Sequence, residues 1–241
     1  MPADRFFVDS TLVEGDNIVV EGQEFTHLTK AMRCGVGDTV EVVNGKGYLA
    51  TATIDAVTKR HASLAIKSVE FFERPTPQVI LAQAMPRLSR LDIILEKGTE
   101  LGMSVLWLFH GDRSEKKSIS DNQRRRITTV MVSAMKQCGR LWLPDVVEMP
   151  PISKWNGIDG TIFFGDIDPT APLLSKAWED RGDGDIIFAV GPESGFSDGE
   201  DKILRDLGAI GVKLHNNILR TDTASLMALS LISHFSMIND Q

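Results

Sequence analysis

The sequence predicts an α/β protein with a mostly parallel sheet covered by helices on both faces, preceded by a small β-barrel. Two observations carry this prediction. Residues 1–72 hold short β-branched runs broken by Gly, Asn and Asp, whereas the chain from residue 78 alternates apolar strands with helical patterns. A length of 241 residues accommodates a small and a medium domain, which we expect at 1–73 and 74–241.

The N-terminal part reads as a barrel because its strands are short and closely spaced. The Asn-Gly-Lys-Gly stretch at 44–47 predicts a hairpin, since Asn and Gly tolerate the positive φ of tight turns. Residues 23–38 predict one short helix that is stopped by Gly35. Strands are expected at 17–22, 38–57 and 62–72.

The C-terminal part reads as βαβ units, which place strands side by side in parallel. Its last helix is strongly apolar. Strands are expected at 78–85, 104–110, 160–167, 185–191 and 209–215, and helices at 89–102, 121–139, 172–181, 197–207 and 221–238.

Composition excludes several classes of protein. The first residues contain no apolar run long enough for a signal peptide, and no apolar stretch reaches the roughly 18 residues of a membrane span. Two cysteines and five histidines without metal-ligand spacing form neither a disulfide framework nor a metal set. We therefore expect a reduced, cytoplasmic protein without a metal and without membrane contact.

The formal charge of −7 is unevenly distributed along the chain. Residues 85–140 carry 11 basic against 6 acidic residues, whereas residues 1–84 carry 8 against 11 and residues 141–241 carry 7 against 16. A basic segment in an acidic protein is either a footprint for a phosphate backbone or a solvated helix face. Charge alone leaves both interpretations open.

The stretch Phe188–Glu200, FAVGPESGFSDGE, follows an apolar strand and therefore lies at the carboxyl edge of the sheet, where open α/β folds bind ligands. Ser197 and Glu200 have the spacing of a capping box, which explains them structurally. The loop lacks the Gly-Lys-Ser/Thr ending of a phosphate loop, and its carboxylate suits a cationic or amine-bearing ligand. A ligand wrapped by main chain would explain the remaining residues, Gly191, Pro192, Glu193 and Gly195.

A second polar loop lies within 214–229, again between a strand and a helix. Thr221 or Thr223 can cap the last helix. Arg220 is either paired with an acid such as Glu193 or directed at a substrate, and the residues alone leave both open.

Three motifs together resemble the SPOUT-class RNA methyltransferases, and within them most closely the RsmE family, which methylates N3 of a uridine in bacterial 16S ribosomal RNA. The first is the Lys-x-x-Glu-Leu-Gly helix end, the second the Gly-Pro-Glu loop with its following Ser-x-x-Glu, and the third the Ile-Leu-Arg-x-x-Thr-Ala segment. The matching residues are Lys97, Glu100, Leu101 and Gly102; Gly191, Pro192, Glu193, Gly195, Phe196, Ser197 and Glu200; and Leu214, Ile218, Leu219, Arg220, Thr221, Thr223 and Ala224.

The likeness extends over nearly the whole chain. Further similar positions are His27, Arg33, Gly35, Gly37, Asp38, Arg113, Gln137, Arg140 and Pro144. The resemblance implies a PUA-like barrel that helps to bind RNA, joined to a knotted α/β domain that binds S-adenosyl-L-methionine. It also implies a homodimer that acts on 16S rRNA of the small ribosomal subunit in ribosome biogenesis. The general avoidance of knots gives no support to the knot.

Residue roles follow from the same resemblance. Arg220 is the expected catalytic residue, because a guanidinium would stabilise the negative charge left on uracil when the N3 proton departs. The expected cofactor contacts are Phe164, Gly165, Gly191, Pro192, Glu193, Gly195, Leu214, Ile218, Leu219, Thr223 and Ala224. The expected RNA contacts are His27, Arg33, Arg113, Lys116, Lys117, Arg124 and Arg140.

Three positions depart from the family pattern: Ser194 replaces a second glycine, His215 the glycine after Leu214, and Asp222 the usual glutamate. His215 places a side chain where the family leaves space. Two alternatives therefore stand beside the enzyme: an RNA-binding relative that has lost catalysis, and a methyltransferase of another RNA or base atom. A generic nucleotide-binding enzyme ranks last, because no phosphate-loop motif occurs.

Overall fold

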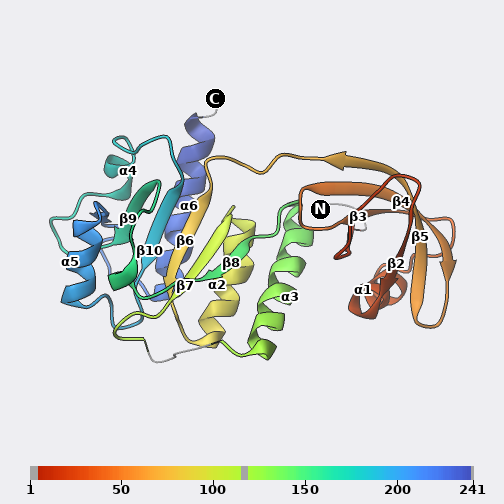
Figure 1. Cartoon of the computed structure of the whole chain (residues 1–241), viewed down its shortest axis with the longest axis horizontal. Helices are drawn as coiled ribbons and strands as arrows, with labels where there is room; N and C mark the ends of the chain where they lie inside the picture. Colours follow the sequence, from red (N-terminus) through yellow and green to blue (C-terminus); the bar gives the residue numbers. More distant parts are fainter. Residues whose placement is uncertain (1–4, 115–118, 240–241) are drawn as a thin grey trace. The chain divides into compact units, whose positions relative to one another are not determined.

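The computed structural model describes residues 5–114 and 119–239, and the chain divides into two compact units (Figure 1). The first unit comprises residues 1–74 together with 132–143, and the second comprises 75–131 together with 144–241. The sequence placed 132–143 in the second domain, whereas these residues group with the first. Helix α3 (Asp121–Cys138) crosses the division, because its residues up to 131 belong to the second unit.

The first unit is built on a five-stranded sheet in the order β1-β3-β4-β5-β2. Strands β1 and β3 run parallel, and the other neighbouring pairs are antiparallel. The expected strands are present, and β1 is additional. The strands are β1 (Arg5–Phe7), β2 (Asn17–Glu21), β3 (Thr39–Val43), β4 (Tyr48–Val57) and β5 (His61–Phe71).

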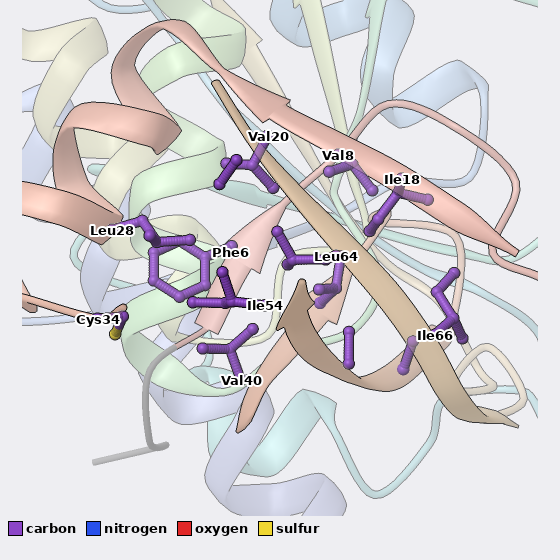
Figure 2. Close-up of a cluster of buried hydrophobic side chains, with 14 of the residues drawn as sticks. Phe6, Val8, Ile18, Val20, Leu28, Cys34, Val40, Ile54, Leu64 and Ile66 are labelled. Carbon is purple, nitrogen blue, oxygen red and sulfur yellow. The ribbon is translucent and has the colours of Figure 1, made fainter. Parts of the chain in front are cut away.

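Alternate residues of these strands fill one apolar core (Figure 2). In β4 the side chains of Ala50, Ala52 and Ile54 are fully buried, while their neighbours face outward. This period of two is the pattern of a sheet with one buried face. Phe6 of β1 and Leu28 of the helical segment complete the cluster, and neither is accessible to solvent.

Two segments of the first unit were predicted in detail, a hairpin and a short helix. The hairpin at 44–47 is confirmed: it joins antiparallel β3 and β4, Gly45 and Gly47 have φ of 70° and 85°, and the Lys46 amide donates to Asn44 Oδ1 at 2.9 Å. The helical segment is shorter than expected, with α1 (Gly22–Thr26) continuing as the π-helix η1 (His27–Ala31). It ends before Gly35, because Arg33 adopts a left-handed conformation with φ of 58°.

The second unit is built on a six-stranded, fully parallel sheet in the order β11-β9-β10-β6-β7-β8. Every residue of β10 is buried, as expected for a central parallel strand. The strands are β6 (Val79–Ala84), β7 (Val105–Phe109), β8 (Asp145–Glu148), β9 (Thr161–Gly165), β10 (Ile186–Val190) and β11 (Ile210–Val212).

Helices cover both faces of this sheet, so the α/β class is confirmed. On one face, Leu204 of α5 (Asp198–Asp206) and Ile152 of the 3-10 helix η2 (Ile152–Lys154) join a core with Ile187 of β10. On the other face, α6 (Thr221–Asn239) packs against α2 (Leu88–Glu100), β6 and β10.

Two elements of the second unit differ from expectation. Strand β8 was not predicted, because it is four residues long and mostly exposed at the sheet edge. Helix α4 (Leu174–Ala177) is much shorter than the range 172–181 that its apolar pattern indicated. None of the described helices has the length and apolar character that crossing a membrane requires.

Candidate functional site

A cavity of about 630 Å³ opens at the carboxyl edge of the parallel sheet in the second unit. Strands β9, β10 and β11 all run in the same direction, so the loops that follow them meet there. These loops supply nearly all of the lining. The volume lies within the range of small-molecule sites, and the wall combines apolar and polar side chains with three glycines, Gly165, Gly191 and Gly195, which offer only main chain.

The loop after β10 is compact and tightly folded. The Gly195 amide donates to the Pro192 carbonyl at 2.8 Å, and Gly195 has a φ of +74°, which favours glycine. A Cβ on Gly191 would lie 3.0 Å from the Phe196 nitrogen and 3.2 Å from the Gly195 carbonyl carbon. Glycine at 191 therefore lets the loop fold back on its own main chain.

The capping box predicted after this loop is confirmed. Ser197 Oγ accepts from the Glu200 amide at 3.1 Å, and Glu200 Oε2 accepts from the Ser197 amide at 2.8 Å. Glu200 is only 4% exposed, and its other oxygen accepts from the Asp112 amide at 3.0 Å. One buried carboxylate thus starts α5 and also fixes the loop after β7.

Arg113 braces the glycine loop from that neighbouring loop. Its Nη1 donates to the Ser194 carbonyl at 3.1 Å, and the side chain lines the cavity. The Ser194 side chain is exposed, so replacing a glycine here leaves the fold of the loop undisturbed. Arg113 was expected to contact RNA, and the structure adds a role in holding the cavity wall.

The loop after β11 is far more exposed. Ile218 is 85% exposed, and residues 215–217 are exposed as well. His215 Nδ1 accepts a hydrogen bond from the Asn217 amide at 3.0 Å. The side chain that replaces the family glycine lines the cavity beside its own loop, and the 630 Å³ space remains.

A buried polar chain anchors the end of this loop. Thr221 Oγ1 donates to the Gly191 carbonyl at 3.0 Å and accepts from Gln83 Nε2 at 2.9 Å. Ser225 Oγ donates to Gln83 Oε1 at 2.5 Å, and neither Gln83 nor Ser225 is accessible to solvent. Strand β6, helix α6 and the glycine loop are therefore joined beneath the cavity by satisfied hydrogen bonds.

A charged contact joins the same two loops nearer the surface. Arg90 of α2 lies 2.6 Å from Asp222 Oδ1 through its Nη1 and 3.4 Å from Glu193 Oε1 through its Nε. The sequence had offered Arg220 as one possible partner of Glu193, whereas the structure pairs Glu193 with Arg90. The position of Arg90 could have indicated this pairing. A positive charge in the first turn of a helix is unfavourable beside the positive end of the helix dipole, so an arginine there is expected to pair with a carboxylate.

The loop after β9 contributes an acidic wall. Asp166 is paired with Arg205 at 2.6 Å, and Arg205 also binds Asp201 and lies 5.0 Å above the Phe164 ring. The hydrogen bonds that Arg205 donates to Asp201 and then to Asp166 raise the pKa of its guanidinium above the ordinary value. The sequence did not reveal Asp166 as a cavity residue, because a lone aspartate after a strand has no distinguishing pattern.

The first family motif serves the packing of α2. Lys97 Nζ lies 2.8 Å from Glu100, one turn along the helix, and Gly102 ends the helix with a φ of +94°. Gly98 faces Met103 and Leu229, so the absence of a side chain admits α6. The motif therefore shapes the helix behind the cavity.

The structure brings most of the predicted cofactor residues together. Thr223 is the exception, since it is absent from the cavity lining, and Arg220 lies beside the lining residues Leu219 and Thr221. The Arg220 side chain is exposed, and no hydrogen bond or ion pair joins it to another described residue. The predicted residues that line the cavity are Phe164, Gly165, Gly191, Pro192, Glu193, Gly195, Leu214, Ile218, Leu219 and Ala224.

The predicted RNA contacts have varied surroundings. His27 and Arg33 are exposed on the first unit, and Lys116 and Lys117 lie outside the described residues. Arg124 is paired with Glu148, which favours a helix-face role for that position.

Arg140 is half-buried, and burial followed by repulsion from Arg74 lowers the pKa of its guanidinium. Within 5–114 and 119–239 no group of three or more His, Cys, Asp and Glu side chains could hold a metal ion.

Family models match both parts of the chain. Residues 73–233 match the model described as the RNA methyltransferase domain, and residues 20–67 match the RNA methyltransferase PUA domain. The ribosomal RNA small subunit methyltransferase E of Bacillus subtilis is 26% identical, over 95% of this chain and 96% of that protein.

Solved structures have the same architecture. A ribosomal RNA small subunit methyltransferase E from Neisseria gonorrhoeae, bound to S-adenosyl methionine, is 25% identical with a TM-score of 0.82, over 96% of this chain and 97% of that one. A probable rRNA-methyltransferase from Porphyromonas gingivalis has a TM-score of 0.85 at 22% identity, over 98% of this chain and 99% of that one. The latter supports the fold alone.

Proposed function

Because the chain belongs to the RNA methyltransferase family, we propose that it transfers a methyl group from S-adenosylmethionine to N3 of a uridine in 16S ribosomal RNA. The similarity to ribosomal RNA small subunit methyltransferases E supports the substrate. The observation that carries the proposal is the cavity at the carboxyl edge, which is walled by the glycine loop and the loop that ends in Arg220.

The cavity fits S-adenosylmethionine in size and chemistry. Its wall offers main-chain groups along the glycine loop and apolar contact from Phe164, Ile218 and Leu219. Four acidic residues, Asp166, Glu193, Asp198 and Asp201, line the cavity against two basic ones, Arg113 and Lys213, and this balance suits a ligand that carries an ammonium and a sulfonium. When bound, this cofactor supplies a methyl group on a positively charged sulfur that is ready for displacement.

The chain's own task is to position the uridine and to stabilise its charge. Loss of the N3 proton to solvent would leave negative charge on N3 and on the two flanking carbonyl oxygens of the uracil, and this anion would be the acceptor for the methyl group. Arg220, exposed at the end of the second loop, is the group we assign to those oxygens. In-line placement of the acceptor supplies the remainder of the rate enhancement.

The remaining roles are proposals on the same basis. Exposed basic residues of both units, including His27, Arg33 and Arg113, would hold RNA phosphates, which carry no sequence information but fix the register of the substrate. We also propose that the protein is a cytoplasmic homodimer with a knotted methyltransferase domain. Domains at 1–73 and 74–241 would then divide RNA binding from catalysis.

Two measurements test the function. Titration calorimetry should detect binding of S-adenosylmethionine with 1:1 stoichiometry per chain, and absence of binding would leave an RNA-binding relative without catalysis. Mass mapping of small-subunit rRNA from a deletion strain should show one uridine that has lost a methyl group and regains it on complementation. An unchanged map with no redundant enzyme would mean another substrate.

A further inference from the structure

Arg90 stands apart from the other residues of the site because it fastens two cavity walls without lining the cavity. It belongs to the first turn of α2, which follows the central strand β6. Its two acidic partners come from different elements: Glu193 lies in the glycine loop after β10, and Asp222 lies in the first turn of α6, directly after the exposed loop. One guanidinium therefore joins three separate parts of the fold.

We propose that Arg90 is a positioning residue, which sets the distance between the two loops that hold S-adenosylmethionine. This inference rests on the proposed function of the cavity. Three observations support it: the geometry, the partial burial of the three side chains, and the charge balance. None of them follows from the sequence motifs.

The geometry fixes both loops to the same group. The Arg90 Nη1–Asp222 Oδ1 distance is 2.6 Å and the Arg90 Nε–Glu193 Oε1 distance is 3.4 Å. The planar guanidinium presents its donors in a rigid fork, so two carboxylates bound to different nitrogens are held at a defined separation. A lysine has the charge without this fork and cannot fix the separation equally well.

Partial burial makes the contact stronger than an ordinary surface ion pair. The side chains of Arg90, Glu193 and Asp222 are 20%, 30% and 19% exposed. Solvent screens the charges less there than at an open surface. The partly buried side chains also lose less conformational entropy when they form the ion pair. The neutral chain of Gln83 and Thr221 lies beneath and ties the same two loops through the Gly191 carbonyl.

The charge balance makes the loss of Arg90 more than the loss of one contact. Glu193 and Asp222 both approach the same guanidinium, so without it two carboxylates would face each other with like charge. Their repulsion would push the glycine loop away from the start of α6. The cavity between those loops would then widen, although no residue in contact with the ligand had changed.

A matched pair of variants tests the proposal. Arg90→Met removes the guanidinium and keeps an unbranched apolar stem, whereas Arg126→Met breaks the Arg126–Asp92 pair, which also involves α2 but touches neither loop. We expect the dissociation constant of S-adenosylmethionine to rise about tenfold in Arg90→Met and to stay within twofold in Arg126→Met. The KM for the cofactor should rise in parallel, with kcat at saturating cofactor unchanged.

A measurement without cofactor separates this inference from the proposed function. Hydrogen exchange of the free protein should accelerate in peptides covering 191–197 and 214–222 of Arg90→Met, and not in those of Arg126→Met. If Arg90→Met fails to fold, Asp222→Asn serves instead, and Asp222→Glu should restore both binding and protection.

Unchanged exchange in both loops overturns the positioning role, whatever the ligand. Cofactor binding of Arg90→Met equal to that of the wild type also overturns it. If exchange accelerates in Arg90→Met while the wild-type protein binds no S-adenosylmethionine, Arg90 still holds the two loops together and only the proposed ligand is rejected.

Discussion

The two loops that wall the cavity are built differently, although both follow parallel strands of one sheet. The glycine loop at 191–197 is braced by Arg113, by Arg90 and by the capping box. The loop at 213–220 is anchored at its two ends, while its middle is exposed and carries one internal hydrogen bond, from Asn217 to His215. A preformed wall suits a cofactor bound by main chain, and an exposed loop suits a large substrate that arrives from solvent.

The largest expected effect separates the roles of the two loops. Arg220→Ala should lower kcat about 100-fold or more, because it removes the charge assigned to the uracil oxygens, while the affinity for S-adenosylmethionine stays unchanged. Single-turnover methylation of small-subunit rRNA and calorimetry measure the two quantities.

The conservative variant is the control. Arg220→Lys keeps a positive charge and should recover part of the rate. A tenfold loss of cofactor affinity in Arg220→Ala would contradict the division of labour between the loops and place Arg220 with the cofactor.

The next effect tests whether the glycine loop is truly preformed. In Gly191→Ala the new methyl group would approach main-chain atoms of residues 195 and 196 at 3.0–3.2 Å, so the loop must shift. We expect a cost of about 2 kcal/mol, shared between lower stability and weaker cofactor binding. Urea unfolding and calorimetry measure the two parts. Gly35→Ala is the control, since nothing lies within 4 Å of its Cβ position and the residue does not line the cavity; equal losses in both variants would contradict the steric argument.

The smallest effect concerns the exposed loop. His215→Gly removes the acceptor for the Asn217 amide, and one hydrogen bond contributes about 1 kcal/mol, so cofactor affinity should fall roughly fivefold or less. His215→Asn should retain the wild-type affinity, because an asparagine side chain can accept from the amide two residues on. Tighter binding by His215→Gly would show instead that the histidine obstructs the cavity.

Local patterns predicted the elements of the fold well. The hairpin at 44–47, the parallel strands and the capping box at Ser197 each depend on residues a few positions apart, which the sequence displays directly. Strand β8 and the end of the first helical segment were missed for the opposite reason. The first depends on pairing with β7, and the second on an arginine in a backbone conformation that glycine usually takes.

The sequence motifs pointed to residues that line the cavity, but they did not point to the residues that hold the cavity loops in place. Gly191 and Leu219, which the motifs propose as cofactor contacts, both line the cavity. Arg90, Gln83 and Asp112 reach the loops from sequence positions more than 80 residues away. Such contacts exist only once the sheet has brought the strand ends together, so no spacing rule reveals them.

Arg33 shows a conflict between stability and use. A non-glycine residue at a φ of 58° raises the energy of the folded chain by about 1 kcal/mol, and glycine would avoid most of that cost. Arg33→Gly should therefore stabilise the protein in urea by about this amount while weakening its binding to small-subunit rRNA at low salt. Stabilisation together with undiminished RNA binding would show that the arginine is dispensable. Stabilisation together with weaker RNA binding would show that stability has been given up at Arg33 in exchange for recognition.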